Sequence, residues 1–506
     1  MPQPVAHVDF GVLNYAMLAL YFCAMLAVGA WASRRVRSSA GYFVAEGKLG
    51  AVVVGMSLLG TYLSALTMMG LPGKAFGPDD LTYSIQLPFL LVTAVVITRF
   101  VLPKYRAAGS ISVYELLERR IHVSCRLVAS ASFILFSIAR MGVILYLPAL
   151  AMSNVAGVPL QRSIVAMGII MTIYTVAGGI EAVIYTEAAQ VLVFIAAAVV
   201  SLAYVLVHTA GGQFGAVVSD PQYHKLRVMA PGYSLYKATS FWLVAETLFS
   251  TIRIYGTQQC FTQRFMTTSS TKKAIQSVWI SILGYIPLAY LFYFMGTALF
   301  VYYHVHPDPN LPKGDAIYPY FVVTCLPPGI AGLVIAGIFA AAMSAVSSLM
   351  NANSTACVED WYRRFATVER PDRHYLRVAR WLSLLWGVLA VVMALAFQHT
   401  KSVVDLWIQI MGIACNGILG FMALAFLPFK VRPWAALCGF GASWLALAVM
   451  LACGTSQFTW AVLGNLTCFG VALVLHLLAI LWQSACMEDQ GGVHQQSEGG
   501  VVERPS

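Results

Sequence analysis

Thirteen long apolar runs decide what this chain can fold into. A helix of about 20 apolar residues is long enough to cross the hydrocarbon core of a bilayer. Only 10% of the residues are charged, whereas a soluble domain carries about 25%. We therefore predict an all-α polytopic membrane protein with thirteen transmembrane helices. The predicted spans lie near residues 11–32, 51–73, 82–103, 127–155, 161–178, 183–208, 239–258, 275–303, 328–350, 379–397, 402–427, 434–453 and 457–482.

The distribution of Lys and Arg predicts the orientation of these spans. With the N-terminus outside, 21 of the 31 basic residues, Arg264 among them, fall in inner loops or the inner tail, and 7 fall in outer segments. Such an excess is typical of the cytoplasmic side. We expect an N-out, C-in transporter domain over residues 1–483 and a disordered cytoplasmic tail over residues 484–506. The expected location is the cell membrane, and the short loops suit a bacterial inner membrane.

The stretch from Met56 to Gly73, inside the second span, is not built like a simple membrane anchor. Hydroxyl residues and glycines crowd its first half, and Gly70, Pro72 and Gly73 follow. This composition weakens a helix and leaves backbone carbonyls without partners, which lipid does not tolerate unless protein or a watery cavity satisfies them. Secondary transporters build ion and substrate sites from such broken helices. Close helix–helix packing through small residues is the alternative explanation.

Charged residues inside spans mark a second set of candidates. Arg140 lies in the fourth span, where an arginine is costly and must face a partner or a cavity. It could pair with a buried acid such as Glu187 or Glu246, or it could bind an anionic ligand. Glu187 lies deep in the sixth span, and Glu246 and Arg253 share a face of the seventh, where they could pair with each other.

Three serines of the ninth span follow the spacing of one helical face. Ser344, Ser347 and Ser348 lie at positions i, i+3 and i+4. Three hydroxyls on one face suit a hard cation that needs oxygen ligands, although interhelical hydrogen bonding would use the same pattern. The sequence contains no phosphate-binding loop and no catalytic constellation, so we expect a transporter and not an enzyme. The net charge of +10 is explained by the inner loops and implies no nucleic acid.

Several motifs in order resemble the sodium:solute symporter family over residues 10–430. They are LSALTMMGLPGKAFG, LPKYRAAGSISVYELLERR, YTVAGGIEAVIYTEAAQ, QCFTQRF and AAAMSAVSSLMNANST, the last running into VEDWYRR. The resemblance implies a LeuT-like core of five plus five spans in inverted repeat. That core would cover about residues 51–427, with one extra span before it and two after it.

The resemblance also implies one sodium site between the broken second span and the ninth span. Its ligands would be the carbonyls of Gly60, Leu63 and Ala341 and the hydroxyl of Ser344. The family usually has a second hydroxyl directly after that serine. This chain has Ala345 there, so one sodium ligand is missing.

A second sodium site, known in some branches, is also implied. It would combine Glu187 with Ser344, Ser347 and Ser348, with Glu where the family usually has Asp. Gln258 is a further departure, because sugar-transporting members often have Asp there.

Within the family, GTYLSALT, Gln86 and RMGVILYLPALA resemble the sialic acid symporters most. Second-span hydroxyls and a fourth-span arginine hold the acid sugar in that branch. Tyr62 is larger than the small hydroxyl residue expected at its position, which would reshape the pocket. Carried over, the substrate-binding residues are Thr61, Tyr62, Ser64, Thr67, Gln86 and Arg140.

The predicted function is sodium-coupled import of a small polar organic anion by alternating access, with sialic acid (N-acetylneuraminate) first. A sodium/monocarboxylate or sodium/sugar symporter is the alternative. Proton coupling, suggested by Ala345, and a sensor that binds ligand without moving it are others. The expected partners are sodium, an acidic sugar or other carboxylate and the lipid bilayer, and we expect the protein to function as a monomer.

Overall fold

The computed structural model describes residues 10–209, 213–399 and 416–498. Within these ranges the chain is helical and contains no β-strand, with a single isolated bridge between Leu49 and Thr268. The elements of the first half are α1 Val12–Ser33, α2 Ser39–Val44, η1 Ala45–Gly47, α3 Ala51–Tyr62, α4 Ala65–Phe76, η2 Thr82–Phe89, α5 Leu90–Val96, η3 Ile97–Val101, α6 Leu102–Ala108, α7 Glu115–Arg120, α8 Val123–Ala156, α9 Leu160–His208 and α10 Gln213–Ser219. The elements of the second half are α11 Ser240–Thr257, α12 Gln259–Thr267, α13 Thr271–Val305, η4 Gly314–Ala316, α14 Ile317–Cys325, α15 Ile330–Ala356, η5 Cys357–Tyr362, α16 Arg363–Phe365, α17 Asp372–Ala396, η6 Phe397–His399, α19 Ile418–Leu424, α20 Pro433–Ala452 and α21 Gln457–Glu498.

The described helices confirm a polytopic membrane protein. Nine of them are long and apolar enough to cross a membrane, and the bent pair α3–α4 adds a tenth. The predicted span near 402–427 falls largely on residues 400–415, outside the described ranges. The count of thirteen and the N-out, C-in orientation stay predictions.

The predicted fifth and sixth spans form one continuous element, α9, of 49 residues. Its helical conformation is interrupted at Gly179, where φ is 52° and ψ is −144°. A side chain is disfavoured in that conformation, and a Cβ atom there would lie 2.6 Å from the carbonyl oxygen of Tyr42. The glycine therefore allows the chain to turn and lets α2 pack against the bend.

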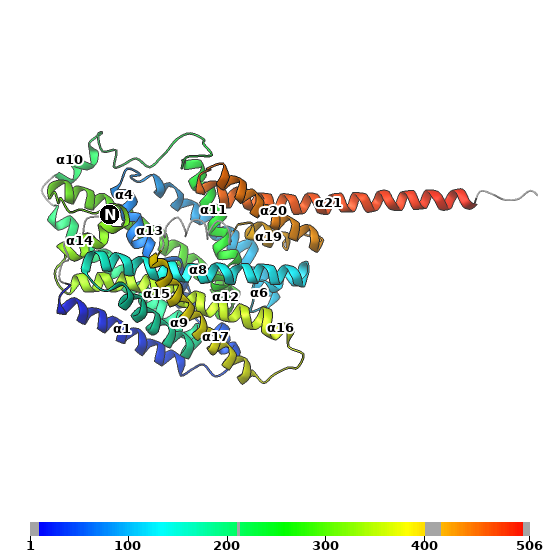
Figure 1. Ribbon diagram of the computed structural model, residues 1–506, viewed down its shortest axis with the longest axis horizontal. Helices are drawn as coiled ribbons and strands as arrows, with labels where there is room; N and C mark the ends of the chain where they lie inside the picture. Colours follow the sequence, from blue (N-terminus) through cyan, green and yellow to red (C-terminus); the bar gives the residue numbers. More distant parts are fainter. Residues whose placement is uncertain (1–9, 210–212, 400–415, 499–506) are drawn as a thin grey trace, which may run out of the picture.

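Helix α15 forms the centre of the bundle (Figure 1). It packs against α9, α8 and α1, and 89% of an 18-residue apolar stretch of this span is buried. Small residues permit this close packing, since a Cβ atom on Gly337 would lie 2.9 Å from Ala197 of α9. A helix buried on all sides can expose its polar groups only to other protein groups or to a site.

The C-terminal helices α20 and α21 pack against each other, and α21 projects from the body (Figure 1). Helix α21 continues to Glu498, past residue 484, where we predicted the start of a disordered tail. The predicted division into a transporter domain and a tail stays a prediction.

Candidate functional site

The predicted broken helix is present, and the break lies between α3 and α4. Leu63 and Ser64 have extended backbone conformations (φ −66°, ψ 141° and φ −139°, ψ 167°). The two helical segments are bent by 55° relative to each other. Helix α4 runs through Pro72, so the break precedes the proline. The sequence therefore indicated the broken span correctly, and the polar residues of its first half mark the point of fracture.

A capping box closes the start of α4 and frees two carbonyl groups of α3. In a continuous helix, the N–H groups of Ser64 and Thr67 would donate to the carbonyls of Gly60 and Leu63. Here the Ser64 N–H donates to Thr67 Oγ1 (3.3 Å), and the Thr67 N–H donates to the Ser64 carbonyl (2.9 Å). The Gly60 and Leu63 carbonyls lose their helical donors, as expected of ion ligands at an unwound segment. Ser64 and Thr67, predicted as substrate residues, thus shape the break itself.

Four predicted sodium ligands lie around one small cavity at this break. Gly60 of α3 and Leu63, the residue directly after α3, line it on one side, and Ala341 and Ser344 of α15 line it on the other. It offers about 10 Å³ to the centre of a water-sized sphere, which is room for about one water or small ion. A Cβ atom on Gly60 would lie 3.0 Å from Ser344 Oγ, so only glycine leaves the cavity open.

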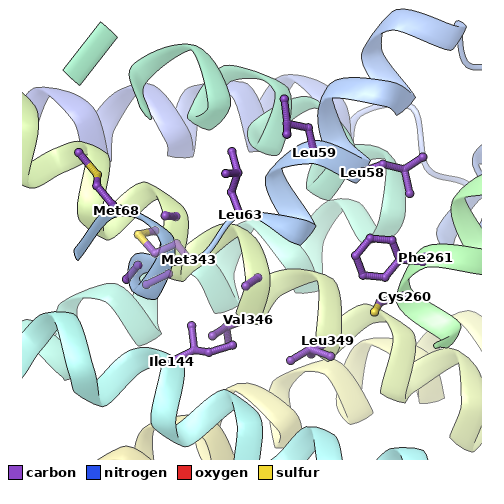
Figure 2. Close-up of a cluster of buried hydrophobic side chains, with 14 of the residues drawn as sticks. Leu58, Leu59, Leu63, Met68, Ile144, Cys260, Phe261, Met343, Val346 and Leu349 are labelled. Atoms are coloured by element: carbon purple, nitrogen blue, oxygen red, sulfur yellow. The ribbon is translucent and has the colours of Figure 1, made fainter. Parts of the chain in front are cut away.

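The lining of this cavity fits a hard cation. Ser344 Oγ is buried and accepts or donates no hydrogen bond within the described part of the chain. It faces two carbonyls that have lost their helical donors. The C-terminal end of α3, with its partial negative charge, points at the same place. Apolar side chains of α3, α8, α12 and α15 gather around the break (Figure 2), which removes bulk water from it.

The second predicted sodium site has a different structure. Both carboxylate oxygens of Glu187 accept hydrogen bonds from Arg264 Nη2, at 2.9 and 2.8 Å. Both side chains are fully buried. The hydroxyls of Ser57 and Ser348 each donate to Glu187 and accept from Arg264, the latter at 2.7 and 2.6 Å. A charged group of the protein itself therefore occupies the place next to the carboxylate.

The structure brings only part of the second predicted ligand set together. Ser348 contacts Glu187, but the Ser347 hydroxyl donates to the Ser344 carbonyl (3.1 Å). Thr61, predicted as a substrate residue, lies 3.1 Å from the Ser348 hydroxyl and 3.4 Å from Glu187 Oε1. This hydroxyl belongs to the cluster around the buried ion pair.

Our placement of Arg264 in an inner loop was wrong. The residue lies on α12 and has no exposed surface. The polar stretch around it looked like a loop because its partner, Glu187, is 77 residues away in sequence. The number of basic residues on one side of the membrane does not reveal which of them are buried. Ser57 was missed because its partner Glu187 is also distant in sequence, 130 residues away.

A second, more polar cavity is lined by Tyr62. It offers about 90 Å³ to the centre of a water-sized sphere. Tyr62 and Gln86, two of the predicted substrate residues, line it, and the Thr247 hydroxyl donates to Gln86 Oε1. The remaining polar lining comes from α11, as Glu246, Ser250 and Thr251. The repeat of polar residues four apart in ETLFST could have signalled this face.

Arg140 lies on α8, near this cavity. Its Nη1 atom donates to Gln258 Oε1 (3.1 Å), at the junction of α11 and α12, and its guanidinium lies 5.6 Å from the Phe136 ring. Its charge also acts on the Tyr62 hydroxyl. The pairing considered for Glu246 and Arg253 is not formed within the described residues, since Arg253 donates to Ser250 at 3.5 Å. Glu246 therefore lines the polar cavity, and the charges of both Arg253 and Arg140 act on the Tyr62 hydroxyl at its border.

The sodium:solute symporter family model matches residues 42–441. The chain belongs to the sodium:solute symporter family. The match covers the broken helix, the buried ion pair, the polar cavity and α15. The family membership confirms the resemblance drawn from the sequence motifs. The chain is a sodium-coupled solute transporter of the membrane rather than an enzyme.

Two bacterial relatives match this symporter over nearly its whole length. The sodium/sialic acid symporter SiaT of Proteus mirabilis is 31% identical over 468 residues, covering 91% of this chain and 94% of the relative. The sodium/sialic acid symporter NanT of Aliivibrio fischeri is 30% identical over 491 residues, covering 95% and 96%.

Solved structures confirm the LeuT-like fold of the symporter. A sodium-coupled sialic acid symporter in a substrate-bound outward-open state superposes with a TM-score of 0.86 at 29% identity, covering 93% of this chain and 98% of that one. Mhp1, a nucleobase-cation symporter in a closed conformation, gives a TM-score of 0.60 at 15% identity, covering 88% and 95%. The second likeness concerns the fold alone.

Proposed function

We propose that this symporter imports an acidic sugar of the sialic acid type together with sodium. The position of Arg140 carries the proposal. A half-buried guanidinium on a transmembrane helix, beside a polar cavity, is suited to a carboxylate because its planar fork can form two parallel hydrogen bonds. Two relatives at about the same identity, both named sodium/sialic acid symporters, support the same substrate class.

The hydrogen bond between Arg140 and Gln258 can be exchanged for one to the substrate. Their hydrogen bond joins a charged donor to a neutral amide, and a carboxylate would be the stronger acceptor. An incoming substrate can therefore replace the Gln258 oxygen. Tyr62, Gln86 and the hydroxyls of α11 would then contact the rest of the molecule. Thr61, Ser64 and Thr67 stay proposed as substrate residues, acting from the edge of the break.

Sodium would couple to this substrate through the break between α3 and α4. The freed carbonyls of Gly60 and Leu63 lie at the end of the helix that also carries Tyr62. An ion bound between α3 and α15 fixes that helix end, and with it the orientation of the Tyr62 side chain. A substrate held by Tyr62 stabilises the same arrangement. The two affinities must rise together by the same factor.

Substrate binding requires the polar cavity to widen. Pockets that enclose drug-sized ligands measure about 300–1,000 Å³, against about 90 Å³ for this cavity. Movement of one part of the bundle against another would open it, as alternating access requires. The broken helix supplies a point at which such movement can occur.

The small volume of the polar cavity favours a second candidate substrate, a short monocarboxylate. Arg140 would bind its carboxylate in the same way, and little widening would be needed. The human sodium-coupled monocarboxylate transporter 2, at 27% identity over 89% of this chain, belongs among the relatives. Competition distinguishes the two candidates, because the true substrate inhibits uptake of the other at lower concentration.

Uptake of labelled N-acetylneuraminate into proteoliposomes tests the proposal. We expect uptake with an inward sodium gradient and none with potassium in its place. Arg140→Ala should abolish the sodium-driven uptake, while Arg120→Ala, an inner-surface arginine that donates to the Leu427 carbonyl, should retain it. No uptake by folded wild-type protein would overturn the sialic acid assignment, and uptake of lactate instead would establish the second candidate.

A further inference from the structure

The small cavity at the α3–α4 break contains an oxygen atom that the predicted sodium site does not include. Gln190 of α9 lines this cavity together with Gly60, Leu63 and Ser344. The residue is 1% exposed. Its Oε1 atom, like Ser344 Oγ, forms no hydrogen bond within the described ranges of the chain. An unsatisfied buried acceptor is costly, so two of them at one cavity call for a common explanation.

Tyr21 of α1 fixes which end of the Gln190 amide faces the cavity. Gln190 Nε2 donates to the Tyr21 hydroxyl oxygen (3.1 Å), and that hydroxyl donates to the sulfur of Met343 (3.7 Å). The Tyr21 hydroxyl therefore donates its proton to Met343 and accepts from the amide nitrogen with its oxygen. With the nitrogen engaged by Tyr21, the remaining amide oxygen is the atom left for the cavity.

The described residues around the cavity bring several oxygen atoms together. The Gly60 and Leu63 carbonyls have lost their helical donors, and the Ser344 hydroxyl can turn its oxygen inwards. The nearest acid, Glu187, is already balanced by Arg264. A water molecule can donate hydrogen bonds to only two of these oxygens, whereas a cation is stabilised by every oxygen around it. The negative end of α3 acts in the same direction.

We propose that Gln190 Oε1 is a ligand of the sodium ion bound at the α3–α4 break. It joins the carbonyls of Gly60, Leu63 and Ala341 and the hydroxyl of Ser344. It supplies an oxygen to a site whose ninth-span face carries Ala345 in place of a hydroxyl. This assignment rests on the sodium site of the proposed function and adds to it a residue from a third helix.

Sodium binding to the purified full-length protein tests the assignment without transport. The melting temperature is followed while sodium replaces potassium at constant ionic strength and pH 8, in the absence of substrate. A ligand that binds only the folded state raises the melting temperature in a concentration-dependent way. Gln190→Leu should weaken the apparent sodium affinity at least about tenfold, since a buried hydrogen-bond-type contact to a charge contributes about that much. Gln161→Leu, on the exposed start of α9, is the matched control and should leave it unchanged.

Gln190→Glu and Tyr21→Phe keep the test decisive if Gln190→Leu does not fold. Glu retains an oxygen at the same reach and adds a negative charge, so sodium should bind more tightly than to wild type. Tyr21→Phe removes the partner of the amide nitrogen and should weaken sodium binding. Sodium affinities within about twofold of wild type for these variants would overturn the role of Gln190 alone. A wild-type protein that responds equally to sodium and potassium would overturn the sodium site and this inference with it.

Discussion

Arg264 Nη2 lies 2.8 Å from Glu187 Oε2, and neither side chain has any exposed surface. The pair joins α12 to α9 in the interior of the bundle, and the hydroxyls of Ser57 and Ser348 complete its hydrogen bonds. Breaking a buried ion pair by removing one partner leaves an uncompensated charge, which costs more than the pair itself contributes. The pair and its two serines therefore join four helices, α3, α9, α12 and α15, beside the proposed sodium site.

Removing one member of this pair should destabilise the protein strongly. We expect Arg264→Met or Glu187→Met to cost about 3–5 kcal/mol, and the double variant to cost much less than the sum. Melting temperatures in sodium-free detergent solution give the comparison. Arg363→Met, which removes one partner of a partly exposed pair with Glu359, should have little effect. A double variant no more stable than the worse single variant would contradict the account.

Gly60→Ala should weaken sodium binding by narrowing the cavity at the break. The added Cβ atom would lie 3.0 Å from both Ser344 Oγ and Val191 Cγ2, closer than ordinary contacts allow. The predicted result is at least about a tenfold loss of sodium affinity, measured by the sodium-dependent melting temperature. Gly50→Ala, at the start of the same helix, meets no atom within 4 Å and serves as the control. Equal sodium affinities for the two variants would show that Gly60 does not border the ion.

Ala345→Ser tests whether the missing family hydroxyl limits sodium coupling. The residue lies one helical turn after Ala341, on the same face of α15. An added hydroxyl there should lower the sodium concentration needed for half-maximal uptake. The measurement is the sodium dependence of uptake at fixed substrate concentration, with wild type alongside. An unchanged dependence would mean that the other oxygens of the site already suffice.

Asp315 should make the protein less stable as the pH rises. Burial is the main cause that raises the pKa of Asp315 above its ordinary value of 3.8, against a lowering by Lys74. The folded state therefore holds this proton more tightly than the unfolded chain, so this contribution to stability is lost as the pH rises above about 3.8 through the folded-state pKa. Asp315→Asn should raise the melting temperature at pH 7 and flatten its pH dependence. Glu369→Gln, at an exposed position, is the control, and a pH dependence unaltered by Asp315→Asn would refute the prediction.

The sequence was enough to predict the broken second helix and four residues that line one cavity at its break. Both depend on local features: hydroxyls and glycines within one span, and serines at helical spacing. Gly60, Leu63, Ala341 and Ser344 do line one cavity. Local pattern also separated the two halves of α9, although Gly179 bends them within one continuous element.

The contacts that join distant segments could not be predicted in the same way. The Arg264 side chain could have faced water or protein, and only the packing of α12 against α3 and α15 decides between them. Gln190 was visible as a polar residue in an apolar span, but its direction depends on Tyr21, 169 residues earlier in the chain. Ser64 and Thr67 form a capping box because the helix breaks directly before them. The glycines and the proline are spread over the whole span, so the sequence did not indicate at which residue the helix would break.

The reciprocity between sodium and substrate tests the central claim most directly. Calorimetric titration of the purified symporter with N-acetylneuraminate, in sodium and in potassium, measures the change in substrate affinity. The sodium affinity is then measured with and without substrate. We predict that sodium raises the substrate affinity, and that substrate raises the sodium affinity by the same factor. Substrate binding of equal strength in sodium and potassium would contradict coupling through the α3–α4 break.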